Sequence, residues 1–210
     1  MGANSVILLG HYGSDGTHAL SAWTSTSREL TDEKRARIPE LLARLAADGH
    51  HTPFEKSTLH FLVQTDIATH IHLLKHRIGV SINAESARYR ELGDEYYVPD
   101  DLPGNLDLII DHHTKKSVQL YHELIAALVA DGVSRSRAKE SARYVLPYAK
   151  QIRADITFNW RSFHHFLKLR LSDHAQVEVR DVASQMLALV AGIEGSPFAA
   201  TIAAFGWSNE

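Results

Sequence analysis

The sequence contains no cysteine, and this absence excludes several kinds of chemistry. Without a thiol there can be no disulfide, no thiolate nucleophile and no cysteine-ligated zinc or iron–sulfur site. Long apolar runs are also missing, since no stretch approaches the ~20 apolar residues that span a bilayer. The first ten residues lack the basic start of a signal peptide. We therefore expect a cytoplasmic protein without a membrane partner.

The usual nucleotide-binding and hydrolase signatures are missing as well. There is no Gly-x-Gly-x-x-Gly after a strand, no Walker loop and no Gly-x-Ser-x-Gly turn. The formal net charge of -3 predicts no general affinity for nucleic acid polymers. If this protein binds phosphate groups, arginines must do so, because guanidinium groups bind them through paired hydrogen bonds.

The chain has 210 residues and a hydrophobic fraction of 44%, which suits a single domain over residues 1–210. Helical segments outnumber strands and do not alternate regularly with them, so the pattern favours an α+β fold. The apolar periodicity predicts strands at 5–9, 57–65 and 152–158, and helices at 31–48, 67–78, 117–131, 134–145, 159–170 and 173–191.

Local details follow from the same pattern. We expect the first strand to be buried, and residues 11–27 and 91–116 to form loops. Leu120 belongs to the inward face of its helix. Asn159 can cap the helix that follows it, and Asp173 with Gln176 resembles a capping box.

Residues 75–89 are unusually rich in polar side chains for a segment that follows an apolar helix. The preceding helix carries Thr69, His72, Lys75 and His76 on one face, with no acidic residue for i,i+4 pairing. Arginines are also numerous near the ends of predicted elements. Any one of them can be a surface ion-pair partner, but as a set they favour an anionic ligand. They are Arg77, Arg88, Arg90, Arg143, Arg161 and Arg170.

The fourteen histidines do not form a recognisable metal site. Pairs occur at His112–His113 and His164–His165, but neither His-Glu-x-x-His nor another ligand spacing is present. Ligand contacts and structural roles account for these histidines better than a metal does.

Four ordered motifs resemble those of the flavin-dependent thymidylate synthases, the ThyX family. Residues 50–55 resemble that family's His-x-Ser/Thr-Pro-Phe-Glu loop, and 75–89 its Arg-His-Arg…Ser signature. Residues 143–147 are similar to its Arg-x-Val-Leu-Pro, and 169–178 to its Leu-Arg…His-Ala-Gln-x-Glu. The match runs from about residue 50 to the C-terminus, in the family's order and spacing.

The resemblance implies a mixed or antiparallel sheet flanked by helices, assembled as a homotetramer with shared active sites. It also implies conversion of dUMP to dTMP, with methylenetetrahydrofolate as the carbon donor and FAD carrying hydride from NADPH. The absence of cysteine agrees, because this family does not use the thiolate of the unrelated cysteine-dependent synthases.

The same resemblance implies site residues. Arg170 would stabilise negative charge on the uracil and Ser86 would support catalysis. The dUMP-binding residues would be His72, Lys75, Glu85, Ser86, Arg88, Arg143 and Arg170. The FAD-binding residues would be Thr52, Glu55, Lys75, His76, Arg77, Asn159, Arg161, His165 and His174.

The chain departs from the family pattern at several positions. Lys75 replaces the first arginine of the signature, and eight residues rather than seven separate Arg77 from Ser86. Glu85 stands directly before Ser86, His72 replaces a glutamine, and His165 replaces an asparagine. Two alternatives therefore stay open: a dUMP hydroxymethylase or other pyrimidine-modifying enzyme on this scaffold, and a non-catalytic nucleotide-binding module.

Overall fold

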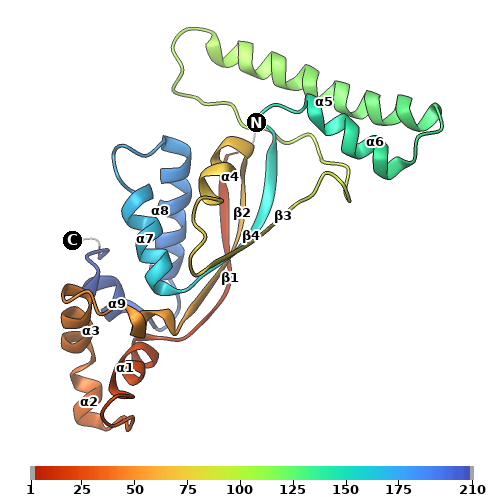
Figure 1. Cartoon of the computed structure of the whole chain (residues 1–210). Helices are drawn as coiled ribbons and strands as arrows, with labels where there is room; N and C mark the ends of the chain where they lie inside the picture. Colours follow the sequence, from red (N-terminus) through yellow and green to blue (C-terminus); the bar gives the residue numbers. More distant parts are fainter. Residues whose placement is uncertain (1–2, 209–210) are drawn as a thin grey trace. The chain divides into compact units, whose positions relative to one another are not determined.

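The computed structural model describes residues 3–208 (Figure 1); residues 1–2 and 209–210 of the expected domain lie outside this range. The described elements are, in order, β1 (Ser5–Tyr12), α1 (Asp15–Trp23), α2 (Asp32–Ala36), α3 (Ile38–Ala47), η1 (Thr52–Glu55), β2 (Thr58–Asp66), α4 (Ile67–Leu73), β3 (Val80–Ala84), α5 (Leu106–Ala130), α6 (Arg135–Ala142), η2 (Arg143–Val145), β4 (Gln151–Phe158), α7 (Trp160–Arg170), α8 (Val177–Ala191) and α9 (Ala199–Ala204). Their mixture confirms the α+β class. No helix within residues 3–208 is long and apolar enough to cross a membrane.

The four strands pair in the order β1-β2-β4-β3. β3 and β4 are antiparallel, because residue numbers fall along β4 as they rise along β3 from one hydrogen-bonded pair to the next. Asn159 N donates to Gly79 O, whereas Glu85 N donates to Arg153 O. The sheet is thus antiparallel, and neighbouring strands run in opposite directions in Figure 1. The strand β3 (Val80–Ala84) was not predicted by the sequence pattern.

The first strand is present, but the prediction that it is buried is wrong. β1 lies at an edge of the strand order, and its residues alternate between exposed and half-buried. Ile7 and Leu9 keep 54% and 48% of their surface exposed. An apolar run in a sheet of this kind therefore does not require coverage on both faces.

The chain divides into two compact units. Within the described residues, the first contains 3–5, 63–75 and 83–154, and the second contains 6–62, 76–82 and 155–208. All four strands contribute residues to both units. Each unit is described by itself below, and the expectation of one domain stays a prediction.

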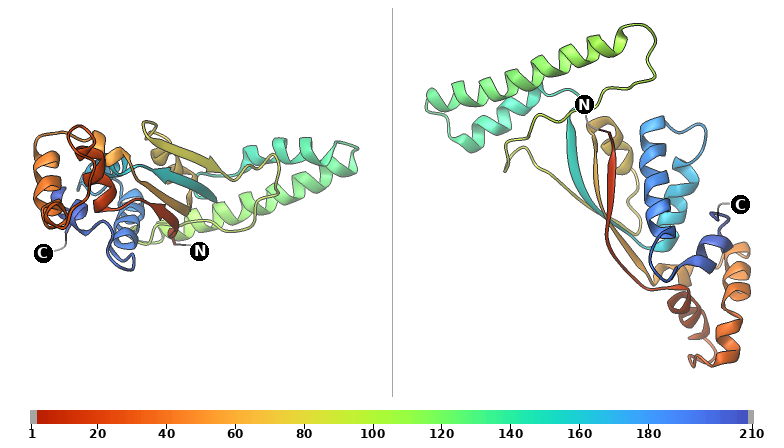
Figure 2. Two further views of the ribbon diagram at one scale, coloured as in Figure 1. Left: turned by 90° about the horizontal axis from the view of Figure 1, so that it is seen from below. Right: turned by 180° about the vertical axis from the view of Figure 1, so that it is seen from behind.

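The first unit contains a hairpin of two helices, α5 and α6, which lie side by side in both Figure 1 and Figure 2. Its core joins Tyr121 and Ile125 of α5 to Ala138 and Ala142 of α6. The Tyr121 hydroxyl also accepts a hydrogen bond of 3.0 Å from the backbone N–H of Leu92, which ties the preceding segment to α5.

Two predictions about α5 are wrong. The helix begins at Leu106, so the second half of the expected loop 91–116 is helical. Asp111 is buried in this part and accepts hydrogen bonds from Tyr96 and Lys115, contacts that a local reading of polar residues cannot reveal. Leu120 does not face inward, since 43% of its surface is exposed.

The second unit has an aromatic core beneath α7 and α8, which pack against each other (Figure 2). Phe163 of α7 stacks on Phe61 of β2 with ring centroids 5.8 Å apart. Trp160 stacks on Phe198 at 5.5 Å, and both side chains are fully buried. Asn159 caps α7 as predicted, because its side-chain oxygen accepts from Ser162 N at 2.9 Å.

Residues 11–27 were expected to form a loop, but α1 occupies most of this range. Ser14 caps the helix by accepting from Thr17 N. The Asp15 carboxylate accepts from the backbone N–H groups of Ala200 and Thr201, both at 2.8 Å. Contacts with residues near the other end of the chain thus fix a helix whose Gly- and Ser-rich sequence predicts little order.

The expected capping box at the start of α8 is also absent. α8 begins at Val177 and its N-cap, Gln176, makes no side-chain capping bond. Asp173 instead lies 3.5 Å from Arg180 on the first turns of the helix. The acidic side chain acts through its charge rather than through a hydrogen bond to the helix backbone.

Candidate functional site

The residues expected to bind dUMP and FAD divide between the two units. All dUMP residues except Arg170 belong to the first unit, and all FAD residues except Lys75 belong to the second. The chain passes from one unit to the other between Lys75 and His76, inside the most polar motif, and returns between Ile82 and Asn83.

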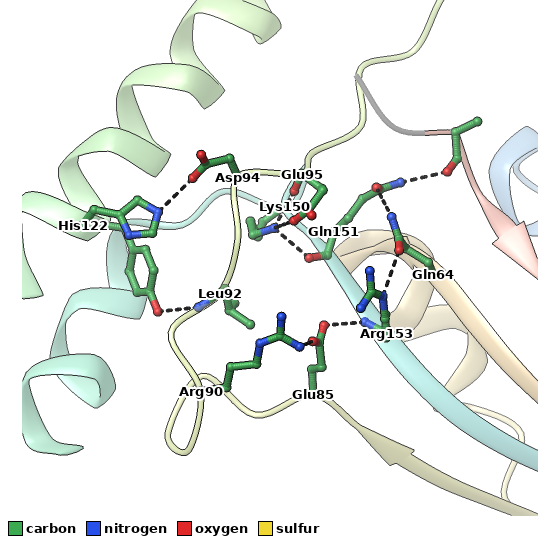
Figure 3. Close-up of polar contacts among 12 residues, drawn as sticks. Gln64, Glu85, Arg90, Leu92, Asp94, Glu95, His122, Lys150, Gln151 and Arg153 are labelled. Atoms are coloured by element: carbon green, nitrogen blue, oxygen red, sulfur yellow. Dashed lines mark hydrogen bonds and ion pairs between the residues drawn. The ribbon is translucent and has the colours of Figure 1, made fainter. Parts of the chain in front are cut away.

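In the first unit, Glu85 is held on both of its carboxylate oxygens (Figure 3). Oε1 accepts from Arg90 Nη1 at 2.8 Å, and Oε2 accepts from the backbone N–H of Arg153 at 3.0 Å. The backbone N–H of Glu85 donates to Arg153 O at 2.8 Å. Glu85 therefore fastens the end of β3 and the turn after it to β4.

Ser86 begins that turn and organises it. Its hydroxyl accepts from Arg88 N at 3.3 Å, and its backbone carbonyl accepts from Tyr89 N and Arg90 N. The Arg88 guanidinium points to Glu140 of α6, with 3.3 Å between Nε and Oε1. Arg137 bonds the other oxygen of Glu140, which holds the pKa of that carboxyl below its usual value.

The other basic side chains of the first unit that are expected to bind dUMP are more accessible to solvent. Arg143 begins η2, is exposed and lies over the ring of Tyr144 at 5.8 Å. Lys75 is exposed in the loop after α4, and His72 on α4 is half-buried. Arg88 and Arg143 are thus two exposed guanidinium groups carried by one unit.

Sequence reasoning missed a polar cleft beside Glu85, several of whose lining residues are labelled in Figure 3. Its lining includes Gln64, Glu95, Arg153 and Lys150. Lys150 is 1% exposed and donates to the backbone carbonyls of Glu95 and Gln151. Burial lowers the pKa of this lysine. Nothing in the pattern before β4 marks it as buried, because its two hydrogen-bond acceptors are backbone carbonyls and its ion-pair partner, Glu95 at 3.9 Å, is distant in sequence.

In the second unit, four of the expected FAD residues line a cleft formed by η1, the 76–82 segment and the start of α7. Its lining residues are His51, Glu55, Ile78, Gly79, Asn159, Arg161, Ser162, His164, His165 and Lys168. Arg161 Nη1 bonds Glu55 Oε1 at 2.7 Å and so joins α7 to η1. The structure brings Glu55, Asn159, Arg161 and His165 together here.

The backbone at Ile78 and Gly79 is fastened to the first turn of α7. Ser162 Oγ donates to Ile78 O at 2.7 Å, and Asn159 N donates to Gly79 O at 3.2 Å. Gly79 has a φ of +67°, and a Cβ there would lie 2.2 Å from Ser162 Oγ. Only glycine permits both this conformation and this close approach.

A buried histidine and an arginine are paired directly. Arg170 Nε donates to His76 Nε2 at 2.9 Å, and His76 is 8% exposed. Burial, followed by the charge of Arg170 and by His165, lowers the pKa of His76 to about 4. The resemblance assigned His76 to FAD and Arg170 to dUMP, yet the two side chains contact each other.

Three basic lining residues of this cleft were not predicted: His51, His164 and Lys168. His164 accepts from Trp207 Nε1 at 3.0 Å through Nδ1. Burial, then the neighbouring His51, Lys168 and His165, lower its pKa to about 4. The signal available in the sequence was the i,i+4 spacing of His164 and Lys168 on one helix face.

The remaining expected FAD residues, Thr52, Arg77 and His174, are exposed at the surface of the second unit. The cleft itself combines two cationic side chains, Arg161 and Lys168, and three histidines with one carboxylate and one amide. Such a donor set fits a flavin dinucleotide, since cations suit its diphosphate and amide or carboxylate groups suit its ring nitrogens and oxygens. Within residues 3–208, no group of three or more His, Asp or Glu side chains could hold a metal ion.

Comparisons with known proteins find similar sequences and similar folds. The family model described as "Thymidylate synthase complementing protein" matches residues 7–193. The flavin-dependent thymidylate synthase of Pseudothermotoga lettingae is 34% identical over 189 residues, covering 85% of this chain and 80% of that one. The enzyme of the same name from Streptomyces avermitilis is 30% identical over 191 residues, covering 79% and 74%.

Solved structures give a second comparison. The UMP/dUMP methylase PolB from Streptomyces cacaoi, bound with 5-Br dUMP, matches with a TM-score of 0.79 and 29% identity, over 98% of this chain and 95% of that one. The same methylase bound with 5-Br UMP also matches with a TM-score of 0.79, at 28% identity.

Proposed function

The chain belongs to the family of the flavin-dependent thymidylate synthases, and on this premise we propose that it converts dUMP to dTMP. Methylenetetrahydrofolate donates the carbon, and NADPH supplies the hydride through FAD. The observation that carries the proposal is the fixed Arg170, which is hydrogen-bonded to a buried neutral histidine in the unit that contains the cationic cleft. A cation held in this way suits a reaction in which negative charge develops on the substrate.

Arg88 and Arg143 bind the dUMP phosphate in this proposal. Both are exposed, and a dianionic phosphate accepts paired hydrogen bonds from guanidinium groups. Arg88 exchanges its contact with Glu140 for the phosphate, while Arg137 keeps the carboxylate of Glu140 partnered. Ser86 contributes a hydroxyl from the same turn, and His72, Lys75 and Glu85 complete the expected set.

Arg170 acts on the pyrimidine. Carbon 5 attacks the incoming carbon from an enolate-like form of the uracil, whose negative charge lies on the carbonyl oxygen, and a fixed guanidinium stabilises that form. Glu55, Asn159, Arg161, His165 and the exposed Thr52, Arg77 and His174 would hold FAD, with Lys75 and His76. FAD, when bound, supplies hydride transfer; the protein residues bind and orient the reactants and limit their contact with water.

The first test uses purified protein supplied with FAD. We expect a yellow protein whose flavin absorbance is bleached by NADPH, and which forms dTMP from dUMP and methylenetetrahydrofolate. A protein that binds no FAD under any condition contradicts the proposal. Tight dUMP binding without NADPH oxidation indicates the non-catalytic nucleotide-binding module instead.

Replacing Arg170 tests the assignment of charge stabilisation. We expect Arg170→Ala to lower kcat by roughly 10²- to 10³-fold, because it removes an interaction made mainly in the transition state. Circular dichroism checks that the variant stays folded. Arg180→Ala on α8 is the matched control and keeps the parent kcat. Normal turnover by Arg170→Ala removes this residue from the proposed site.

A second candidate is methylation of UMP as well as dUMP. It is favoured by the match with the UMP/dUMP methylase PolB, which covers nearly all of both chains. Comparing kcat/KM for UMP and dUMP decides between the two. The mass of the product separates both from a hydroxymethylase, since a methyl group adds CH2 and a hydroxymethyl group adds CH2O.

A further inference from the structure

His76 and Arg170 form a contact whose chemistry fixes the state of the histidine. An arginine side chain can only donate hydrogen bonds, so the atom that receives Arg170 Nε–H must carry a lone pair. That atom is His76 Nε2, at 2.9 Å. The ring is therefore neutral, with its proton on Nδ1, whenever this bond is present.

The surroundings hold the ring in this state. His76 is 8% exposed and packs edge-on against Phe166, with ring centroids 5.0 Å apart and planes at 80°. Phe166 lies one helical turn before Arg170 on α7, so ring and guanidinium contact the same face of the helix. The titratable groups that face His76 within the second unit are Arg170 and His165, both basic, and they disfavour a charged ring.

The bond also fixes the orientation of the guanidinium. The group is planar, and its donors lie in a rigid fork. Once the direction of Nε–H is set by His76, the directions of the two Nη groups are set as well. The long arginine side chain would otherwise move among many rotamers, and ordering it has an entropic cost.

We propose that His76 is a positioning residue that aims Arg170 at the substrate through the Nε2 acceptor. This role is separate from the flavin contact that the family resemblance assigns to His76, and it rests on the proposed function of Arg170. The donor edge of Arg170 is then oriented before substrate binds, so the reaction need not spend binding energy on ordering this side chain.

Two substitutions separate an acceptor from a space-filling side chain. His76→Gln retains an acceptor oxygen near the position of Nε2, whereas His76→Leu fills the pocket without one. We expect His76→Leu to lower kcat roughly 10- to 100-fold, the value of a hydrogen bond to a charged group, with a smaller change in the KM for dUMP. His76→Gln recovers most of the parent kcat. The control is His60→Gln, which replaces a histidine of the same unit that pairs with Asp155. We expect this variant to keep the full parent kcat.

Flavin binding and proton position are measured on the same proteins. Because His76 is also an expected FAD contact, kcat of each variant is measured at saturating FAD, and we expect ¹⁵N NMR to show an unprotonated Nε2 in the parent. Equal loss of kcat in the two FAD-saturated variants, or a protonated Nε2 at pH 7, overturns the proposal. The NMR result does not depend on turnover, so failure of the thymidylate synthase activity alone is distinguishable from failure of this inference.

Discussion

Gly79 shows how a single residue constrains the segment between the two expected ligand sets. The extra residue of the 75–89 motif falls beside it, in the Gly79–Val80 pair. Its positive φ and its closeness to Asn159 and Ser162 place two separate demands on the position. Gly49 provides the comparison, because it has a φ of +72° but no atom within 4 Å of a built Cβ.

Alanine at these two glycines separates steric crowding from backbone strain. We expect Gly49→Ala to lower the free energy of unfolding by about 1 kcal/mol, the cost of the left-handed conformation. Gly79→Ala should cost roughly 2 to 4 kcal/mol, because a Cβ also meets the first turn of α7. Urea unfolding followed by tryptophan fluorescence gives both values. Equal losses would show that crowding at Gly79 relaxes at no cost.

His18 links the stability of the second unit to pH. It is fully buried, with Nδ1 3.0 Å from Thr201 Oγ1 and Nε2 2.9 Å from Ser57 Oγ, and burial lowers its pKa from 6.5 to about 4. Between these two values the unfolded chain binds the proton and the folded chain does not. Stability is therefore complete above pH 6.5 and falls as the pH drops to about 4.

Replacing His18 isolates its contribution to the pH dependence of the unfolding free energy. Over that window, we expect His18 to account for a loss of about 3 kcal/mol in the parent. His76 and His164 titrate in the same direction, while Asp15, whose pKa is raised by burial, opposes them. His18→Gln should therefore show a shallower decline of unfolding free energy from pH 7 to 4.5. An unchanged slope would assign the acid sensitivity to the other groups.

At the scale of elements, segments with clear local signals were predicted and contact-dependent ones were not. Two expected helices were wrong in extent: 31–48 divides into α2 and α3 at Arg37, and 67–78 ends at Leu73. The strand at 57–65 and the helix capped by Asn159 follow from alternation and from a capping residue, which are local signals. α1 and the first turns of α5 depend on partners distant in sequence, and their polar residues suggest loops when read locally. β3 is too short to show a clear period.

The sequence motifs predicted the candidate functional site to a similarly limited extent. The motifs identified residues that the structure gathers at one cleft of the second unit, such as Asn159 and Arg161. They could not reveal that both oxygens of Glu85 bond groups from β4 and the turn, or that His76 contacts Arg170. Such contacts depend on side-chain directions that spacing along the chain does not encode.

The cap of α7 can be tested without disturbing its aromatic core. Asn159→Ala removes the oxygen that accepts from Ser162 N, and we expect a loss of about 1 kcal/mol in unfolding free energy. Asn159→Asp retains an acceptor at the same position and adds a favourable charge at the helix start, so its stability should match the parent. Thermal unfolding of the two variants is the measurement. A loss of similar size in both would assign the effect to the side-chain amide rather than to capping.

For the whole molecule, the family resemblance leads us to propose a homotetramer. The helix α5 exposes large apolar side chains, with Leu108 55% and Ile109 63% exposed. Surfaces of this kind often become buried on association. We expect light scattering to give four times the 23.4 kDa chain mass. Ile109→Lys should lower it, while Glu123→Lys on the same helix should not; a monomeric parent would contradict the proposal.

The bonds from Asp15 to Ala200 and Thr201 have a consequence for synthesis of the chain. The partners of α1 emerge from the ribosome some 185 residues after Asp15 itself. The first unit draws most of its residues from the continuous stretch 83–154, so its helical hairpin can form while translation continues. The second unit cannot close until α9 has left the ribosome. Until then, the Asp15 carboxylate and the His18 ring lack their native partners, which makes the nascent N-terminal region a natural client for chaperones.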